Sequence, residues 1–188
     1  LQRRRQRQMC IRDRSWAGGL RRYDLSINLR KPQNVPMPMD WQSQLSTCQD
    51  SAYIDTVSKI TGESIPVLKD YYLNPRDPGD GGNHNHKAFS VLAYDDRIWV
   101  GTANGINKGR IVEEITQISE NEFEILSCIE WDHYKYPTNG ISGNFVVALG
   151  KQDWNGQTTI WAATVGTGEV GEMQGLSYSR DEGISWKT

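Results

Sequence analysis

Apolar residues in this chain recur in short runs of strand length, each followed by a tryptophan-bearing segment and a glycine turn. Two such runs, at residues 88–93 and 144–149, contain few polar positions and align on Phe89 and Phe145. Runs of this kind are typical of strands buried on both faces. The segments that follow contain an apolar residue, a tryptophan and a small residue, and the glycine turn after them indicates a hairpin. The pattern predicts antiparallel strands repeated along the chain.

The glycine turn occurs three times, and each time an aliphatic residue follows the glycine. Gly19, Gly105 and Gly175 are 86 and 70 residues apart. Because a repeat of four strands needs fewer residues, each unit must carry insertions. The expected order in a unit is inner strand, tryptophan strand, glycine-turn strand and outer strand. We expect the end of one unit at residues 15–46, a complete four-stranded antiparallel unit at 87–132 and a truncated unit at 141–188.

Residues 47–86 interrupt the repeat. Spaced apolar residues at 50–61 predict one short amphipathic helix. The density of Pro and Gly at 74–86 predicts an irregular loop. This loop brings polar side chains to the start of the strand near Ala88 and is the candidate ligand or metal loop, with Asp77, Asp80, Asn83, His84 and His86.

Two interpretations of this loop are open. Asp and Asn oxygens can ligate calcium, but their spacing differs from that of an EF-hand loop, and Asx turns are their ordinary function. His84 and His86 share one face if the chain is extended, but a third zinc ligand is not visible. We therefore expect no metal and no other cofactor, with calcium as the alternative.

The most specific motif lies at residues 179–186, where Ser-Arg-Asp-Glu-Gly-Ile-Ser-Trp predicts a tight turn between two strands. Asp181 is short enough to accept hydrogen bonds from backbone N–H groups of the turn, and Gly183 can take positive φ. Trp186 then buries a large apolar area between sheets. The motif resembles the Asp-box, or BNR repeat, of sialidase-like β-propellers, with every consensus position filled: Ser179, Asp181, Gly183, Ser185 and Trp186. In those families the box is structural and lies away from the catalytic face.

A second resemblance extends the first. Residues 98–108 resemble the propeller repeat of two-component-regulator sensors. Together the resemblances imply an all-β chain, a partial β-propeller of four-stranded antiparallel blades with an inserted loop and short-helix segment. They also imply an extracellular or periplasmic location and, as partners, the remaining blades of a parent protein. The tryptophans beside the glycine turns are then expected to pack between blades: Trp16, Trp99 and Trp161.

The N-terminus differs in composition from the rest of the chain. Residues 1–14 hold six arginines and one aspartate without apolar periodicity and resemble translated adapter sequence from metagenomic assemblies, so we expect them to be non-native or disordered. The remaining chain has 15 basic and 22 acidic residues, which argues against a nucleic-acid partner. No apolar run is long enough to span a membrane. The cysteines beyond this segment, Cys48 and Cys128, lack zinc-site spacing, and whether they pair is left open.

Catalytic candidates are limited to carboxylates near predicted strand ends: Asp95, Asp96, Asp132 and Asp153. Glycoside hydrolysis needs two carboxyl groups about 5–10 Å apart, whereas turn carboxylates are commonly solvated. The sequence shows no nucleophile elbow, no phosphate loop and, beyond residues 1–14, no arginine set for a sialidase substrate.

Two hypotheses about function remain. The first is a non-catalytic platform for binding, sensing or structure in a larger secreted or cell-surface protein, with a carbohydrate or small molecule as ligand. The second is part of a sialidase-like or other Asp-box glycoside hydrolase. Enzymatic activity is left open, and the non-catalytic platform is favoured because no catalytic constellation is visible.

Overall fold

The computed structural model describes residues 19–22, 33–47, 84–119, 122–167 and 170–188. These residues form ten β-strands and one turn of 3₁₀ helix, η1 (His84–His86), so the described part of the chain is all-β. It contains no helix that is long and apolar enough to cross a membrane. Several predictions lie outside the described residues: the adapter-like segment 1–14, Trp16, the expected helix at 50–61, and Asp77, Asp80 and Asn83.

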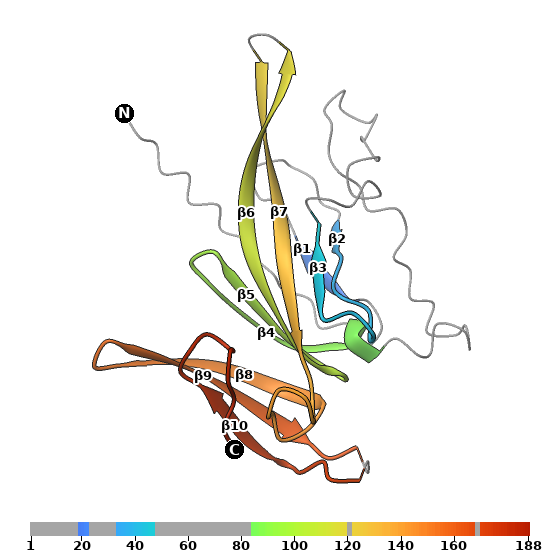
Figure 1. Cartoon of the computed structure of the whole chain (residues 1–188), viewed down its shortest axis with the longest axis vertical. Helices are drawn as coiled ribbons and strands as arrows, with labels where there is room; N and C mark the ends of the chain where they lie inside the picture. The colour runs from blue at the N-terminus through green and yellow to red at the C-terminus, as the bar shows by residue number, and fades with distance from the viewer. Residues whose placement is uncertain (1–18, 23–32, 48–83, 120–121, 168–169) are drawn as a thin grey trace, which may run out of the picture.

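The largest sheet has five antiparallel strands in the order β3-β7-β6-β5-β4 (Figure 1). Four of them form a meander along the chain: β4 (Ala88–Tyr94), β5 (Arg97–Thr102), β6 (Gly105–Ser119) and β7 (Glu122–Tyr134). The fifth, β3 (Gln44–Ser46), pairs with β7. Residues 44–46, expected at the end of the first unit, therefore belong to this middle sheet instead. Three residues carry too little periodicity to have shown this pairing.

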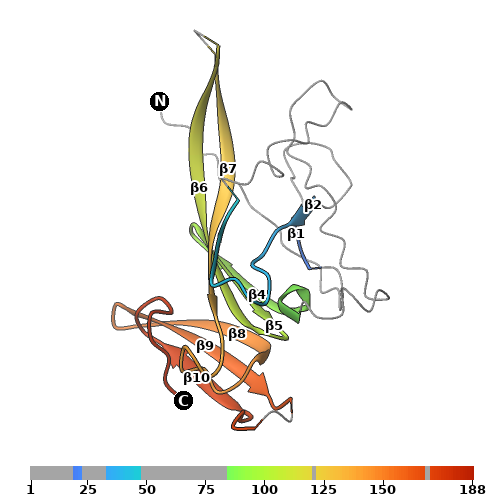
Figure 2. The same cartoon turned by 45° about the vertical axis from the view of Figure 1, so that its right-hand side comes forward.

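A second sheet, here called the C-terminal sheet, has the order β10-β9-β8. Its strands are β8 (Phe145–Trp154), β9 (Gln157–Val165) and β10 (Gly175–Ser179). An isolated bridge between Tyr178 and Lys187 adds one pairing beyond β10. The remaining sheet consists of β1 (Leu20–Arg22) and β2 (Gln33–Val35). The C-terminal sheet contacts β4 and β5, while the long β6–β7 hairpin projects away from it (Figures 1 and 2).

The tight turns between strands depend on residues with positive φ. Asn155 and Gly156, with φ of 49° and 76°, join β8 to β9. Asn-Gly is the pair that two-residue hairpins favour. Gly105 begins β6 with φ of 105°, and a Cβ there would lie 2.1 Å from the carbonyl oxygen of Tyr134. Both conformation and space therefore require glycine at this position.

Both faces of the middle sheet contribute side chains to an apolar core. One face contributes Ile98 and Trp131 to an apolar core that includes Leu20 from β1. The other face contributes Trp99 and Ile106 to a second core, shared with the C-terminal sheet. Ile98 and Trp99 enter different cores because successive side chains of a strand point to opposite faces. The sheets thus form three layers, with the middle sheet between β1–β2 and the C-terminal sheet.

The middle and C-terminal sheets repeat the same pairing residue by residue. The glycine-turn strands, β6 and β10, pair with the tryptophan strands, β5 and β9, in the same register. In the middle sheet, Trp99 pairs with Lys108 and Gly101 with Ile106. In the C-terminal sheet, Trp161 pairs with Tyr178 and Ala163 with Leu176. The first strand of each sheet is irregular at the same place, after Ala88 and after Val146. The two sheets therefore share one pairing pattern over three strands, β4 to β6 in one and β8 to β10 in the other.

This register corrects the sequence alignment of the inner strands. The alignment on Phe89 and Phe145 is wrong by two residues, because Val147 takes the irregular, unpaired position that Phe89 takes. The two phenylalanines contact each other instead, with ring centroids 4.5 Å apart. An aromatic residue shared by two apolar runs shows their similar composition but does not fix which residues are equivalent.

Candidate functional site

The turn at residues 179–186 follows β10 and is closed by its own side chains. Asp181 Oδ1 accepts hydrogen bonds from Ser179 Oγ (2.8 Å) and Ser185 N (2.9 Å), while Oδ2 accepts from Ser185 Oγ. Ser179 Oγ in turn accepts from Gly183 N (2.8 Å). Hydrogen bonds from Ser185, and then from Ser179, hold the pKa of Asp181 at about 2, below its usual value. The carboxylate is therefore ionised and committed to the turn, which does not suit proton transfer near neutral pH.

The same turn contacts the middle sheet. Trp186 is 6% exposed and meets Trp99 edge to face, with ring centroids 6.2 Å apart. Glu182 adds charge to this contact, because its carboxylate lies 3.1 Å from Arg97 Nε and 3.4 Å from Lys108 Nζ. Lys108 Nζ also donates to the Glu182 carbonyl oxygen at 2.6 Å. This contact of the 179–186 turn with β5 and β6, here called the seam, joins the two repeated sheets.

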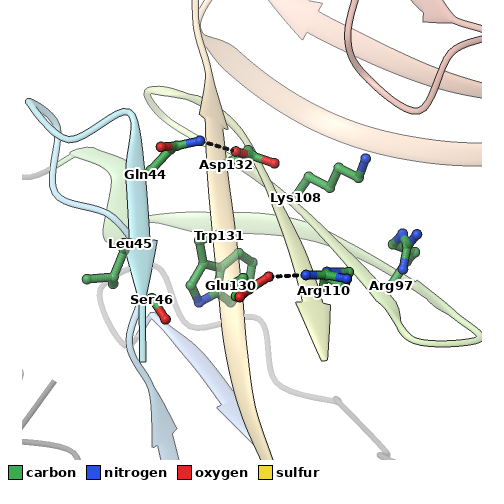
Figure 3. Close-up of a pocket in the computed structure, with 9 residues that line it drawn as sticks. All are labelled: Gln44, Leu45, Ser46, Arg97, Lys108, Arg110, Glu130, Trp131 and Asp132. Carbon is green, nitrogen blue, oxygen red and sulfur yellow. Dashed lines mark hydrogen bonds and ion pairs between the residues drawn. The ribbon is translucent and has the colours of Figure 1, made fainter. Parts of the chain in front are cut away.

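A hollow of about 440 Å³ opens on the middle sheet (Figure 3). Its charged side chains come from one face of three strands, β5, β6 and β7, because Lys108 pairs with Asp132 and Arg110 with Glu130. Gln44 of β3 pairs with Asp132 on the same face. Arg97 lies opposite Arg110 on β5 and continues the row. The lining residues are Gln44, Leu45, Ser46, Arg97, Lys108, Arg110, Glu130, Trp131 and Asp132.

Each charged side chain of the hollow has a partner. Arg110 forms an ion pair with Glu130, and Gln44 Nε2 donates to Asp132 Oδ1 at 3.0 Å. The two other cations are held by Glu182 at the seam. The Arg110–Glu130 pair is open to solvent, with 53% and 45% of the two side chains exposed. The hollow thus presents mixed charge that suits contact with a polar ligand.

The four candidate carboxylates lie on three different elements. Asp132 lines the hollow. Asp95 and Asp96 form the turn between β4 and β5 and are exposed. Asp153, near the end of β8, accepts a hydrogen bond from Lys151, which lowers the pKa of Asp153. The structure therefore does not gather the four carboxylates into one site.

Turn η1 holds the described part of the candidate loop. His84 is exposed, with Nδ1 3.2 Å from Lys87 Nζ, whereas His86 is buried, with Nε2 3.2 Å from the Met37 carbonyl oxygen. Burial lowers the pKa of His86. The extended conformation in which the two histidines would share a face is not formed. Within the described residues, no group of three or more His, Cys, Asp or Glu side chains is arranged to hold a metal ion.

Turn η1 instead contributes to a buried polar cluster that sequence reasoning missed. Thr102 Oγ1 donates to Asn85 Oδ1 (2.8 Å), and the side-chain amides of Asn85 and Asn107 exchange hydrogen bonds of 2.8 and 2.9 Å. Asp40 fixes the turn by accepting from the backbone N–H groups of His84 (2.8 Å) and Asn85 (2.7 Å). All three side chains of the cluster are fully buried. They tie the entry of β4 to β5 and β6.

The C-terminal sheet has a matching cluster. Thr164 and Ser177 take the positions of the threonine and asparagine above, and Ser142 Oγ lies 2.7 and 3.0 Å from their hydroxyl oxygens. All three side chains are buried. The signal in the sequence is a threonine three residues after Trp99 and after Trp161, and a polar residue two positions after Gly105 and after Gly175. The two clusters thus agree with the register at the threonine and at the residue after the glycine turn, while their third members, Asn85 and Ser142, are not equivalent in it.

Cys128 in β7 is buried and disulfide-bonded. The other two cysteines, Cys10 and Cys48, lie outside the described residues. The pairing of Cys48 with Cys128 therefore stays open.

Comparisons of the chain with protein-family models, with curated proteins and with solved structures gave no match.

Proposed function

We propose that the chain is part of a non-catalytic β-propeller that acts as a binding, sensing or structural platform of a larger secreted or cell-surface protein. The observation that carries this proposal is the seam between two antiparallel sheets that share one pairing pattern, where Trp186 packs on Trp99 and Glu182 meets Arg97. Propellers are built by radial repetition of such sheets, or blades. The serine, aspartate, glycine and tryptophan of the 179–186 turn then serve the packing of one blade on the next.

The engagement of the carboxylates supports a non-catalytic function. Asp181 is held by its own turn, Glu182 by the seam, and Glu130 by Arg110. Glycoside hydrolysis instead needs one carboxyl group free to donate a proton and a second to act as nucleophile or base. Glu130 and Asp132 both line the hollow, but Arg110 engages Glu130 and Gln44 engages Asp132.

The hollow is the surface that we assign to ligand binding. The Arg110–Glu130 ion pair is half exposed, and ion pairs in such positions contribute only about 0–1 kcal/mol. A polar ligand can therefore replace the pair with its own contacts at small cost. Carbohydrates and small polar molecules fit this mixed surface. The disulfide at Cys128 supports an oxidising compartment, hence an extracellular or periplasmic location.

The test is a glycan array followed by calorimetric titration of the 188-residue chain. We expect binding without turnover, weakened about tenfold or more in an Arg110→Ala, Glu130→Ala double variant. The matched control is a Lys151→Ala, Asp153→Ala double variant, which removes an ion pair that does not line the hollow. Hydrolysis of aryl glycosides, aryl sialosides included, that is lost in Asp132→Asn would make the chain an enzyme and contradict the proposal. A chain with neither binding nor turnover would leave only the structural platform.

A further inference from the structure

One face of the C-terminal sheet is apolar and partly exposed. On this face, Trp161 of β9 lies beside Tyr178 of β10, and Ala163 lies beside Leu176. Because side chains alternate along a strand, the neighbouring Ile160 and Ala162 point to the other face and enter the core shared with the middle sheet. Leu176 is 53% exposed. These four residues, Trp161, Ala163, Leu176 and Tyr178, are here called the open face. Large apolar side chains gathered on one sheet face usually mark a contact surface.

The equivalent apolar positions of the middle sheet are buried. By the shared register, Trp99 corresponds to Trp161 and Ile106 to Leu176. Trp99 and Ile106 are both completely buried, because the C-terminal sheet with Trp186 lies on them. Equivalent positions of the two sheets thus differ in burial, and within the described residues only those of the middle sheet have a following sheet packed on them.

The first glycine turn repeats this relation. Leu20 follows Gly19 as Ile106 follows Gly105, and Leu20 is 1% exposed. It is buried in the core that it shares with the middle sheet. In two of three cases, therefore, the aliphatic residue after the glycine is covered by the sheet that comes next along the chain. Leu176 is the third case.

A cation lies beside an aromatic ring at the open face as in the seam, although Arg180 is two residues further along the strand register than Lys108. In the seam, Lys108 Nζ lies 5.4 Å from the centroid of the Trp99 ring and bonds Glu182. At the open face, the guanidinium of Arg180 lies 5.3 Å from the centroid of the Tyr178 ring. A cation beside an aromatic ring is thus present in both places, and in the seam that cation receives an acidic residue from the docking turn.

We infer that the open face docks a further antiparallel sheet of this repeat, carried by the same polypeptide. Its turn places an aromatic residue on Trp161, as Trp186 packs on Trp99, and an acidic residue against Arg180, as Glu182 meets Lys108. The inference rests on the proposed function, because it assumes that further sheets of the same repeat pack on the two repeated sheets. It adds the partner's chemistry and the residues that receive it.

The test compares thiol labelling in two proteins, the 188-residue chain and the natural polypeptide of the complete reading frame. Each carries Leu176→Cys, and labelling by a maleimide is followed at that peptide by mass spectrometry. We expect rapid labelling in the 188-residue chain and labelling slower by about tenfold or more in the natural polypeptide, because the thiol then reacts only after local opening. Trp41→Cys is the control, because Trp41 is 77% exposed and lies outside the two repeated sheets; it should label equally fast in both proteins.

Three results would overturn the inference. One is equal labelling of Leu176→Cys in both proteins, and another is a natural polypeptide that ends at Thr188. The third is slow labelling in the 188-residue chain that becomes fast on dilution, since a second copy would then cover the face. The measurement uses no ligand, so its failure is separate from failure of the glycan-binding test.

Discussion

Replacing Trp186 tests whether the seam holds the two repeated sheets together. The indole is 6% exposed and packs against Trp99 at 6.2 Å and Tyr134 at 6.5 Å between ring centroids. Removing a buried aromatic side chain of this kind costs about 3–5 kcal/mol. The edge-to-face pair contributes about 0.5–1.5 kcal/mol beyond area burial. We therefore expect Trp186→Ala to lower the free energy of unfolding by about 3–5 kcal/mol.

Trp186→Phe separates the ring contact from the indole N–H. Nε1 of Trp186 is buried and has no acceptor among the described residues, and leaving a buried donor unpaired costs about 1–3 kcal/mol. Phenylalanine removes that donor and keeps a ring against Trp99. Loss of packing and relief of the unpaired donor then oppose each other, so the net loss should stay below about 2 kcal/mol.

The assay is urea unfolding followed by far-ultraviolet circular dichroism, because the substitutions themselves change tryptophan fluorescence. Trp154→Ala is the control, since Trp154 is 71% exposed and exposed substitutions usually stay within about 0.5 kcal/mol. If Trp186→Ala and Trp154→Ala shift the midpoint equally, the seam does not stabilise the fold and the reasoning is refuted.

Three further predictions concern the turn and the buried clusters. Because the pKa of Asp181 is lowered from 3.8 to about 2 in the folded state, its ionised form stabilises the fold above pH 3.8, and this stability is lost as the pH falls toward about 2. The urea midpoint of Asp181→Asn should therefore fall less than that of the parent as the pH is lowered through this range. Gly183→Ala should cost about 1–3 kcal/mol in the same assay, because φ is +88° and a Cβ would lie 2.9 Å from the Trp99 ring, whereas Gly150→Ala, with no heavy atom within 4 Å of its Cβ, should be nearly neutral. Thr102→Val should cost about 1–3 kcal/mol, because it removes a buried donor to Asn85; midpoints unchanged from the parent would contradict that cluster's contribution.

The sequence predicted the strands of the two repeated sheets because their information is local. Apolar runs, tryptophans and turn glycines lie within a few residues of one another. The sequence did not predict that β3 joins β7, since residues 44–46 are too few for a periodic signal and their partner lies far along the chain. The alignment on Phe89 and Phe145 failed for a related reason, because only the hydrogen-bond register shows which of two neighbouring apolar residues is unpaired.

The candidate site likewise has a part that the sequence predicts and a part that it does not. The hydrogen bonds of the 179–186 turn join residues two to four apart, so the spacing of Ser179, Asp181, Gly183 and Ser185 already determines them. The hollow is assembled from four strands, and its composition depends on pairings that no short segment contains. The histidines of η1 were misplaced because the extended conformation assumed for them competes with a 3₁₀ turn that Asp40 caps from 45 residues away.

The 179–186 turn shows why a strong local motif predicts architecture without predicting activity. Asp181 points back into the turn and binds Ser185 N, which fixes the backbone directly before Trp186. Glu182, with φ of 59°, and Trp186 point outward and meet the middle sheet. Asp181 thus fixes the backbone of the turn, and this backbone places Glu182 and Trp186 against the middle sheet. Since the inward-pointing and outward-pointing side chains are all engaged in these contacts, none is available to bind a ligand.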